Sequence, residues 1–203
     1  AQNHSIADKD LTEKMLYPAV NRLGERKCKV YHIHGELTDS EILGLITSKK
    51  TSAYYTTTFA EGFGLPLFDA AAHGLPIIAP KFSGYLDFLH IPHTSATNKT
   101  ERRFMFEPIK VDIKEVPDHC IMDGIITKGT KWGFPDKQKT IKALREVYNN
   151  YKIKKKRAEL LKEYIHETFS RENQLEKMCE AIKTGYENDQ SSWNEEMNEV
   201  QVL

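Results

Sequence analysis

Residues 59–79 read FAEGFGLPLFDAAAHGLPIIA. Pro66 and Gly74 bracket the middle of this stretch, and a proline near the start with a glycine just past the end is typical of a helix. Residues 76–79 are apolar throughout, as expected for a strand that is buried on both faces. A helix that leads directly into such a strand predicts a parallel sheet.

The segments upstream continue this alternation of strands and helices. Residues 52–58 are rich in Tyr and Thr and predict a strand. Thr38 and Glu41 form a capping box that opens a helix. Residues 30–34 predict another strand. The pattern over residues 9–27 predicts an amphipathic helix that ends at Gly24. The order predicts an α/β fold, a Rossmann-like parallel sheet with helices on both faces.

The pattern loosens downstream of residue 90. Residues 104–113 predict one more strand, and residues 114–134 are irregular. Three helices are predicted to follow, from about 136, at 153–169 and at 171–186. We expect one domain over 1–186, with carboxy-terminal helices from about 136, and a polar tail over 187–203.

Composition excludes several classes of function. The chain has 29 Lys+Arg against 29 Asp+Glu, and without a basic excess we expect no nucleic-acid partner. No run of about 18 apolar residues occurs, so we expect membrane contact to be peripheral at most. Residues 1–10 lack the apolar segment of a secretory signal. Cys28, Cys120 and Cys179 lack the spacing of a thiolate zinc site and indicate a reducing, cytoplasmic location.

The turn at 61–65 carries the candidate chemistry. Gly62 and Gly64 lie between a predicted strand and the amino end of a helix, where N–H groups and the helix dipole bind phosphate. Glu61 precedes this turn and Asp69 lies one turn into the helix, so a carboxylate flanks the anion site on each side. Carboxylates accept hydrogen bonds from sugar hydroxyls. The pattern therefore predicts binding of a nucleoside diphosphate sugar at the carboxyl edge of the sheet.

The same stretch resembles the signature of the family 4 retaining glycosyltransferases, which have the GT-B architecture of two facing Rossmann-like domains. In that signature an acidic residue is followed after seven residues by a second one, as Glu61 is by Asp69. Gly-x-Pro-hydrophobic-hydrophobic-Ala comes next, here at 74–79. Ser83-Gly84 stands where the family often has Gly-Gly, and KWGFPD at 131–136 resembles a Trp-x-x-Pro-Asp element.

This resemblance, over roughly residues 9–170, implies a donor-binding domain of a retaining hexosyltransferase. The implied reaction moves a hexose from a nucleoside diphosphate sugar to a hydroxyl acceptor such as a saccharide, and the family needs no metal or other cofactor. Glu61 is implied to be catalytic and to bind the transferred sugar, and Asp69 to hold the ribose of the nucleotide. Further contacts are implied for Gly62, Phe63, Gly64 and Leu65 with the donor sugar and for Gly84 with the nucleotide.

Two departures from the family pattern matter. Asp69 is one methylene shorter than the usual Glu. The sequence also resembles only the carboxy-terminal half of a GT-B enzyme, so we expect an amino-terminal acceptor domain on the same or a separate chain. The basic pair of the family has weak candidates for its Lys in Lys9 and Lys14, and no counterpart for its Arg.

Other interpretations of these residues stay open. A glycine-rich turn also serves tight packing, Asp69 also suits a polar helix face, and Phe63 suits either a donor sugar or the core. Trp132 suits packing or base stacking, and the basic run at 152–157 suits a solvated helix face better than a contact with anionic lipid. The alternative functions are a non-catalytic nucleotide-sugar-binding or partner-docking module and a nucleotide-sugar epimerase of the same architecture.

Overall fold

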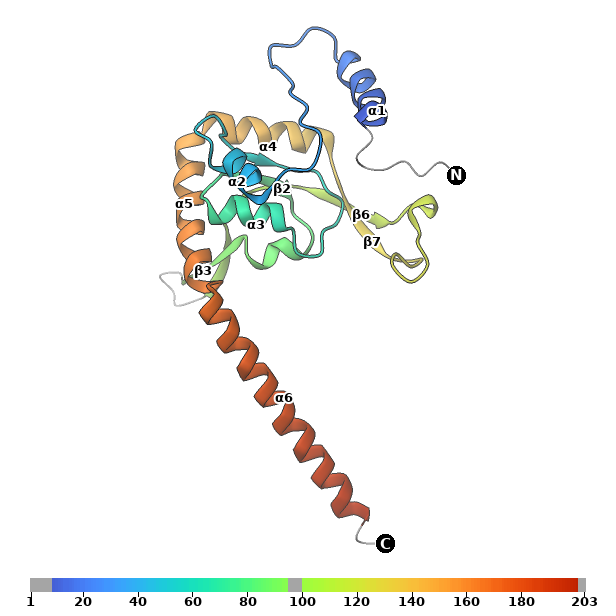
Figure 1. Ribbon diagram of the computed structural model, residues 1–203, viewed down its shortest axis with the longest axis vertical. Helices are drawn as coiled ribbons and strands as arrows, with labels where there is room; N and C mark the ends of the chain where they lie inside the picture. The colour runs from blue at the N-terminus through green and yellow to red at the C-terminus, as the bar shows by residue number, and fades with distance from the viewer. Residues whose placement is uncertain (1–8, 95–99, 201–203) are drawn as a thin grey trace. The chain divides into compact units, whose positions relative to one another are not determined.

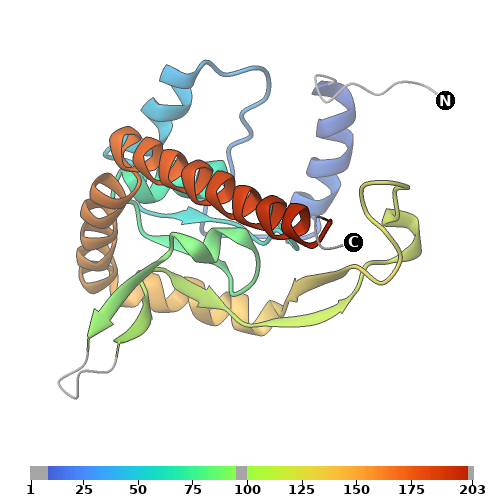
Figure 2. The same cartoon turned by 90° about the horizontal axis from the view of Figure 1, so that it is seen from below.

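The computed structural model describes the backbone of residues 9–94 and 100–200 and the side chains of 9–93 and 101–185 (Figures 1 and 2). The chain divides into two compact units, residues 1–45 and 46–203. The first unit holds α1 (Lys9–Asn21) and most of α2 (Asp39–Thr47). Each unit is described by itself.

The first unit departs from the sequence prediction in two places. α1 ends at Asn21 rather than at Gly24, and Gly24 has a left-handed φ of 65°. The predicted strand at 30–34 is wrong, because the described part of this unit contains no strand. A strand needs a neighbour to satisfy its backbone N–H and C=O groups, and a local apolar pattern does not supply one.

The capping box at the start of α2 is confirmed. The Thr38 N–H donates to Glu41 Oε2 at 2.8 Å, and the Glu41 N–H donates to Thr38 Oγ1 at 3.3 Å. The hydrogen bonds from the backbone and hydroxyl of Thr38 lower the pKa of Glu41. The helix therefore begins at this point for the reason that the sequence indicates.

The second unit is built on a three-stranded parallel sheet with the strand order β1-β2-β5. The strands are β1 (Tyr54–Tyr55), β2 (Ile77–Pro80) and β5 (Glu107–Ile109). β2 is central and buried at every position, as predicted from its apolar sequence. The α/β fold class is confirmed.

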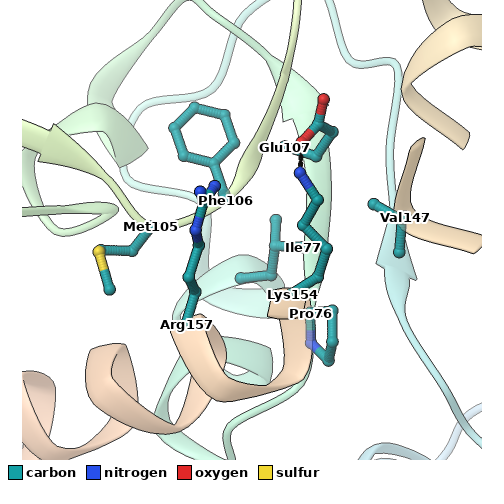
Figure 3. Close-up of a pocket in the computed structure, with 8 residues that line it drawn as sticks. All are labelled: Pro76, Ile77, Met105, Phe106, Glu107, Val147, Lys154 and Arg157. Atoms are coloured by element: carbon teal, nitrogen blue, oxygen red, sulfur yellow. Dashed lines mark hydrogen bonds and ion pairs between the residues drawn. The ribbon is translucent and has the colours of Figure 1, made fainter. Parts of the chain in front are cut away.

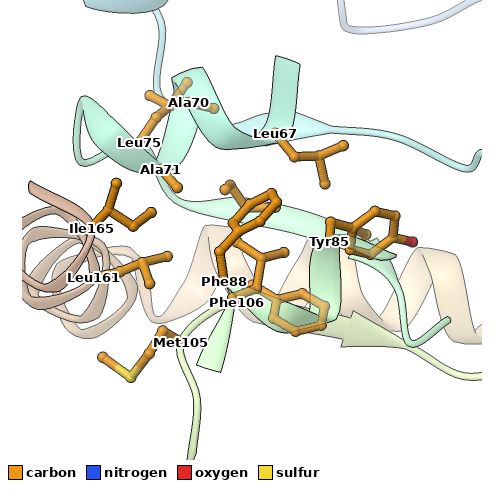
Figure 4. Close-up of a cluster of buried hydrophobic side chains, with 13 residues drawn as sticks. Leu67, Ala70, Ala71, Leu75, Tyr85, Phe88, Met105, Phe106, Leu161 and Ile165 are labelled. Carbon is orange, nitrogen blue, oxygen red and sulfur yellow. The ribbon is translucent and has the colours of Figure 1, made fainter. Parts of the chain in front are cut away.

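Helices pack on both faces of this sheet. On one face, Leu67 and Ala71 of α3 (Leu65–Ala72) share a core with Leu161 and Ile165 of α5 (Tyr151–Thr168), as Figure 4 shows. On the other face, Ile78 of β2 packs with side chains of β5 and of α4 (Lys137–Asn149): Ile109, Ala143 and Val147. Each large side chain that is fully buried in this way contributes about 1.5–3 kcal/mol.

Two antiparallel hairpins flank the sheet, where the sequence predicted one strand at 104–113. β3 (His90–Thr94) pairs with β4 (Thr100–Phe104), and β6 (Val111–Glu115) pairs with β7 (Lys131–Pro135). The single-strand prediction is wrong, because its residues belong to β4, β5 and β6 in three different sheets. Each piece pairs with a strand outside residues 104–113, which a local alternation of apolar residues does not reveal. Figure 2 shows the two hairpins at opposite sides of the unit.

The carboxy-terminal helices begin as predicted but end differently. Asp136 caps α4, because its Oδ1 accepts the Lys139 N–H at 2.8 Å. α6 runs from Arg171 to Val200. The predicted end of this helix at 186 is therefore wrong, because the helix continues to Val200. The domain boundary that the polar tail over 187–203 implies stays a prediction.

The basic run at 152–157 is the solvated helix face that the sequence favoured only in part, at the exposed Lys152 and Lys156. Lys154 Nζ lies 2.7 Å from Glu107 Oε2 and 3.0 Å from Glu146 Oε1, and only 11% of its side chain is exposed. Lys155 donates to the carbonyl oxygen of Gly74 at 2.7 Å. Lys154 and Arg157 extend from α5 toward the amino end of β5, beside a cavity of about 10 Å³ (Figure 3). That volume suits one water molecule. The ion pair of Lys154 with Glu107 and the hydrogen bond of Lys155 to Gly74 hold α5 on the sheet.

Candidate functional site

Two loops meet at the carboxyl edge of the parallel sheet. One loop follows β1 and contains Glu61, and the other follows β2 and contains Ser83. The Glu61 N–H donates to Ser83 Oγ at 2.6 Å, and the Ser83 hydroxyl donates back to the Glu61 carbonyl oxygen. The Gly84 N–H donates to the same carbonyl oxygen at 3.3 Å. Main-chain and side-chain hydrogen bonds thus fix the start of the predicted anion turn.

Gly64 is the residue that turns the loop into α3. It is buried, it precedes the helix as its N-cap, and its φ of 84° and ψ of 57° are left-handed. A Cβ at this position would lie 3.1 Å from Leu67 Cδ1 and 3.3 Å from Tyr85 Cδ1. Glycine is therefore required here by conformation and by core packing, whether or not a ligand binds.

The turn offers a series of free backbone donors. Within the described residues, the N–H groups of Gly62, Phe63, Gly64 and Leu65 have no hydrogen-bond acceptor, whereas those of Leu67 and Phe68 donate to the Gly64 carbonyl oxygen at 2.9 Å and 3.0 Å. Free N–H groups are expected in the first turn of a helix. Here the series extends back through the preceding turn, to the residue after Glu61.

Glu61 is half-buried beside two tyrosines. Tyr85 is fully buried, and its hydroxyl donates to the Pro80 carbonyl oxygen at 2.8 Å. Burial raises the pKa of Tyr85 most, the Thr58 hydroxyl opposes this rise, and the negative charge of Glu61 adds to it. Burial and then the same carboxylate also raise the pKa of Tyr54. The charge of Glu61 therefore acts on the edge of the sheet where β1 and β2 end.

Asp69 lies in α3 as predicted, and its side chain is exposed. Its carbonyl oxygen lies 2.8 Å from Nδ1 of His73, which places that histidine at the end of the helix. The Asp69 carboxylate makes no ion pair or hydrogen bond with any residue that the structure describes. It is thus available to a ligand, and it equally suits the ordinary polar face that the sequence left open.

The aromatic residues near the turn pack on one another. The Phe63 ring lies 5.4 Å from that of Phe68 and 5.1 Å from that of Phe88, while 43% of the residue stays exposed. The ring centroids of Trp132 and Phe59 lie 6.0 Å apart, and the Gly133 N–H donates to the Phe59 carbonyl oxygen at 3.0 Å. Phe63 and Trp132 therefore both make packing contacts, which was one of the two interpretations left open for each.

Sequence reasoning missed the role of Ser83, which it noted only as a replacement for a family glycine. Ser83 has φ 103° and ψ 177°, and it is the one residue other than glycine with positive φ in the described chain. This region of backbone conformation is essentially restricted to glycine. A hydroxyl residue at an expected glycine position was a readable signal, but its partner lies 22 residues away.

Other sites offer less. A cavity of about 330 Å³ lies between the β3–β4 hairpin and α5, lined by Ile91, Pro92, His93, Arg103, Met105, Leu160, Glu163, Tyr164 and Glu167. Neither this cavity nor the small one beside Lys154 is lined by a residue of the turn. We place the candidate site at the turn because free donors and a carboxylate meet there. Across the described residues, no cluster of three or more His, Cys, Asp and Glu suits a metal ion, and no helix is long and apolar enough to cross a membrane.

Comparison with known proteins finds a family match that lies within the second unit. A family model described as "Family 4 Glycosyltransferase in conflict systems" matches residues 48–178, which is more than half of the chain and includes the turn, the Ser83 loop and both hairpins. Residues 9–47, which the resemblance was expected to include, lie outside this match.

The curated relatives match a shorter segment. Two proteins described as probable sucrose-phosphate synthase 1, from Craterostigma plantagineum and Citrus unshiu, are each 39% identical over 57 residues. This segment is 28% of the chain and spans 5% of the length of each relative. No solved structure matches the chain. The family match decides the assignment: the chain belongs to the family 4 glycosyltransferases.

Proposed function

We propose that this chain binds the donor in a retaining glycosyltransferase, which transfers a hexose from a nucleoside diphosphate sugar to a hydroxyl acceptor. The carrying observation is the run of four consecutive N–H groups without acceptors, at the amino end of α3. Such a run, reinforced by the positive end of the helix dipole, suits the two phosphates of a nucleotide sugar. The names of the two relatives refer to the synthesis of a sugar phosphate, and this favours a sugar as the transferred group.

The turn amides have two tasks in this proposal. They hold the diphosphate in the ground state, and they stabilise the negative charge that grows on it as the bond to the sugar breaks. They are held in place before the ligand binds, because the Gly84 N–H fixes the Glu61 carbonyl oxygen at the start of the turn and Gly64 has a fixed left-handed conformation at its end. A site whose donors are already oriented needs little reorganisation during the reaction.

The two carboxylates then bind hydroxyls on either side of the diphosphate. Glu61 takes the catalytic position and accepts hydrogen bonds from the transferred sugar, and Asp69 accepts them from the ribose. The exposed, unpaired carboxylate of Asp69 supports its part. Retention and the absence of a metal requirement rest on the family, and the acceptor side of the site is proposed to lie on another domain or chain.

Calorimetric titration tests the proposal. UDP, GDP and ADP are titrated into the purified chain, and then UDP-glucose, GDP-mannose and ADP-glucose. We expect one base to be preferred, with Asp69→Ala weakening binding of the free diphosphate and Glu61→Ala weakening only the additional affinity for the nucleotide sugar. Each loses charge-assisted hydrogen bonds worth about 1.5–3 kcal/mol, or roughly 10- to 150-fold in affinity.

Asp123→Ala is the matched control, because Asp123 is also exposed and lies in the loop between β6 and β7. If Glu61→Ala and Asp69→Ala weakened binding of the free diphosphate equally, the assignment of Glu61 to the sugar and of Asp69 to the nucleotide would be refuted. Absence of binding by the unaltered chain to all six compounds would refute the proposed donor site.

A further inference from the structure

The Ser83 loop carries a strained backbone that its surroundings hold in place. The φ of 103° and ψ of 177° at Ser83 belong to a region that residues with a side chain rarely occupy. Glycine would relieve this strain. A side chain that persists at such a position needs a compensating interaction, and residues of this kind gather at functional sites.

The side chain of Ser83 supplies this interaction through two hydrogen bonds to Glu61. The Ser83 hydroxyl accepts the Glu61 N–H at 2.6 Å and donates to the carbonyl oxygen of the same residue. A hydroxyl combines a donor and an acceptor on one atom, so it can bind both groups of one residue, which the methyl group of alanine cannot do. The Gly84 N–H adds a further hydrogen bond to that carbonyl oxygen.

Two consequences follow for the turn. The main chain of Glu61 is fixed on both sides of its Cα, so the direction of its side chain is restricted before any ligand arrives. The N–H of Glu61 is also occupied, so the series of free donors begins at Gly62. Both effects concern the residue that the proposed function places against the transferred sugar.

We propose that Ser83 is a positioning residue that sets the orientation of Glu61 toward the sugar of the donor. The proposal rests on the proposed function, and it assigns Ser83 no direct contact with the donor. It follows that loss of the hydroxyl weakens recognition of the sugar more than binding of the nucleotide.

Three variants test this assignment. Ser83→Ala removes the hydroxyl and keeps the strain, whereas Ser83→Gly removes both. Ser170→Ala is the matched control, because the Ser170 hydroxyl also accepts a backbone N–H, that of Asn173 at 3.2 Å. The affinities for the preferred nucleoside diphosphate and for its sugar conjugate are measured by calorimetry, and stability is measured by thermal unfolding.

We expect Ser83→Ala and Ser83→Gly to bind the sugar conjugate roughly 5- to 30-fold more weakly, while affinity for the free diphosphate changes less than about twofold. Ser83→Gly is expected to melt above Ser83→Ala, because the strain is relieved. Sugar recognition and stability then change in different ways, which a merely structural role does not predict. The proposal would be overturned if the loss of affinity for the sugar conjugate in the two variants were proportional to the loss of melting temperature.

Hydrogen exchange separates this inference from the proposed function. The Glu61 amide is expected to be protected in the ligand-free protein and to exchange at least tenfold faster in Ser83→Ala. An unaltered chain that protects this amide but binds no nucleotide would refute the proposed function, and the role of Ser83 with it. If the unaltered chain binds the sugar conjugate, and both Ser83 variants prefer it over the free diphosphate to the same extent as the unaltered chain, only the role of Ser83 is refuted.

Discussion

Gly84 lies so close to Gly62 that a Cβ on Gly84 would be 1.7 Å from the Gly62 carbonyl oxygen. The atom in the way belongs to the backbone, so a side-chain rotation does not make room for it. The two loops that frame the candidate site thus approach each other only because residue 84 is glycine. The family glycine here has a packing role that needs no ligand, and its contact with the nucleotide stays a prediction.

The first prediction concerns this approach. Gly84→Ala is expected to separate the loops and to lower the free energy of unfolding by about 2–4 kcal/mol, since a strained backbone and lost hydrogen bonds both contribute. Gly185→Ala is the control, because a Cβ there meets no atom within 4 Å. Equal unfolding midpoints in urea for Gly84→Ala and the unaltered chain would contradict the packing described here.

The second prediction separates conformation from packing at Gly64. Gly64→Ala places a Cβ against Leu67 and Tyr85, whereas Gly129→Ala meets open space at a similar φ, 87° against 84°. Both are expected to cost about 1 kcal/mol for the positive φ, and Gly64→Ala about 1–2 kcal/mol more for overpacking. Urea unfolding of both variants measures the difference, and equal losses would show that the core yields at Gly64.

The third prediction concerns Lys154. Lys154→Met removes the cation between Glu107 and Glu146 and is expected to destabilise the unit by about 3 kcal/mol, since Glu107 is left half-buried without its partner. Lys152→Met is the control, because Lys152 is exposed and makes no ion pair in the described chain. If Lys154→Met lost no more free energy of unfolding than Lys152→Met, the packing of α5 would not depend on this ion pair.

The fourth prediction is the acid dependence of the same contact. Lys154 lowers the pKa of Glu146 below its ordinary 4.5 through a hydrogen bond and its charge. A carboxyl whose pKa is lower when folded stabilises the fold above its unfolded pKa, and this stabilisation is lost as the pH falls through the folded value. Unfolding measured between pH 7 and pH 3 is therefore expected to show a smaller acid loss in Lys154→Met. A greater loss of stability on acidification in Lys154→Met than in the unaltered chain would contradict this prediction.

The fifth prediction concerns alkaline pH. Burial, with a further rise from Glu61, raises the pKa of Tyr85 above its ordinary 10.0, so the stability that it contributes is present below pH 10 and is lost as the pH rises further. Tyr85→Phe is expected to lose about 1 kcal/mol at neutral pH with the hydrogen bond to Pro80. Between pH 9 and pH 11, Tyr85→Phe is also expected to lose less stability than the unaltered chain. Equal losses of stability in the two proteins over this pH range would contradict the prediction.

The sequence predicted the parts of the fold that local signals determine. The Pro66–Gly74 helix, the capping box at Thr38 and the buried strand predicted at 76–79 and found at 77–80 all follow from residues within a few positions of one another. The hairpins did not follow, because the single alternating run at 104–113 is divided among β4, β5 and β6, and each of these pairs with a strand outside that run. The continuation of α6 to Val200 was missed because polar residues lack the apolar stripe that indicates a helix.

The same division applies to the candidate site. The turn, its glycines and the position of Asp69 on α3 were readable from the order of residue types. The free donors were expected from the helix start. The hydrogen bonds between Ser83 and Glu61 were not readable, because they join residues that lie on loops after two different strands. Likewise, the role of Lys154 depends on Glu107, which is distant in sequence.

The central claim is that the N–H groups of Gly62 to Leu65 bind the diphosphate of the donor. The most direct test is a ¹H–¹⁵N NMR titration of the purified chain with UDP, GDP and ADP. We predict that the preferred compound shifts the amide signals of residues 62–65 most, and that the corresponding nucleoside without phosphates leaves them unchanged. Shifts confined to other residues, such as those around the cavity at Arg103 and Glu163, or no shift with any of the three compounds, would contradict the claim.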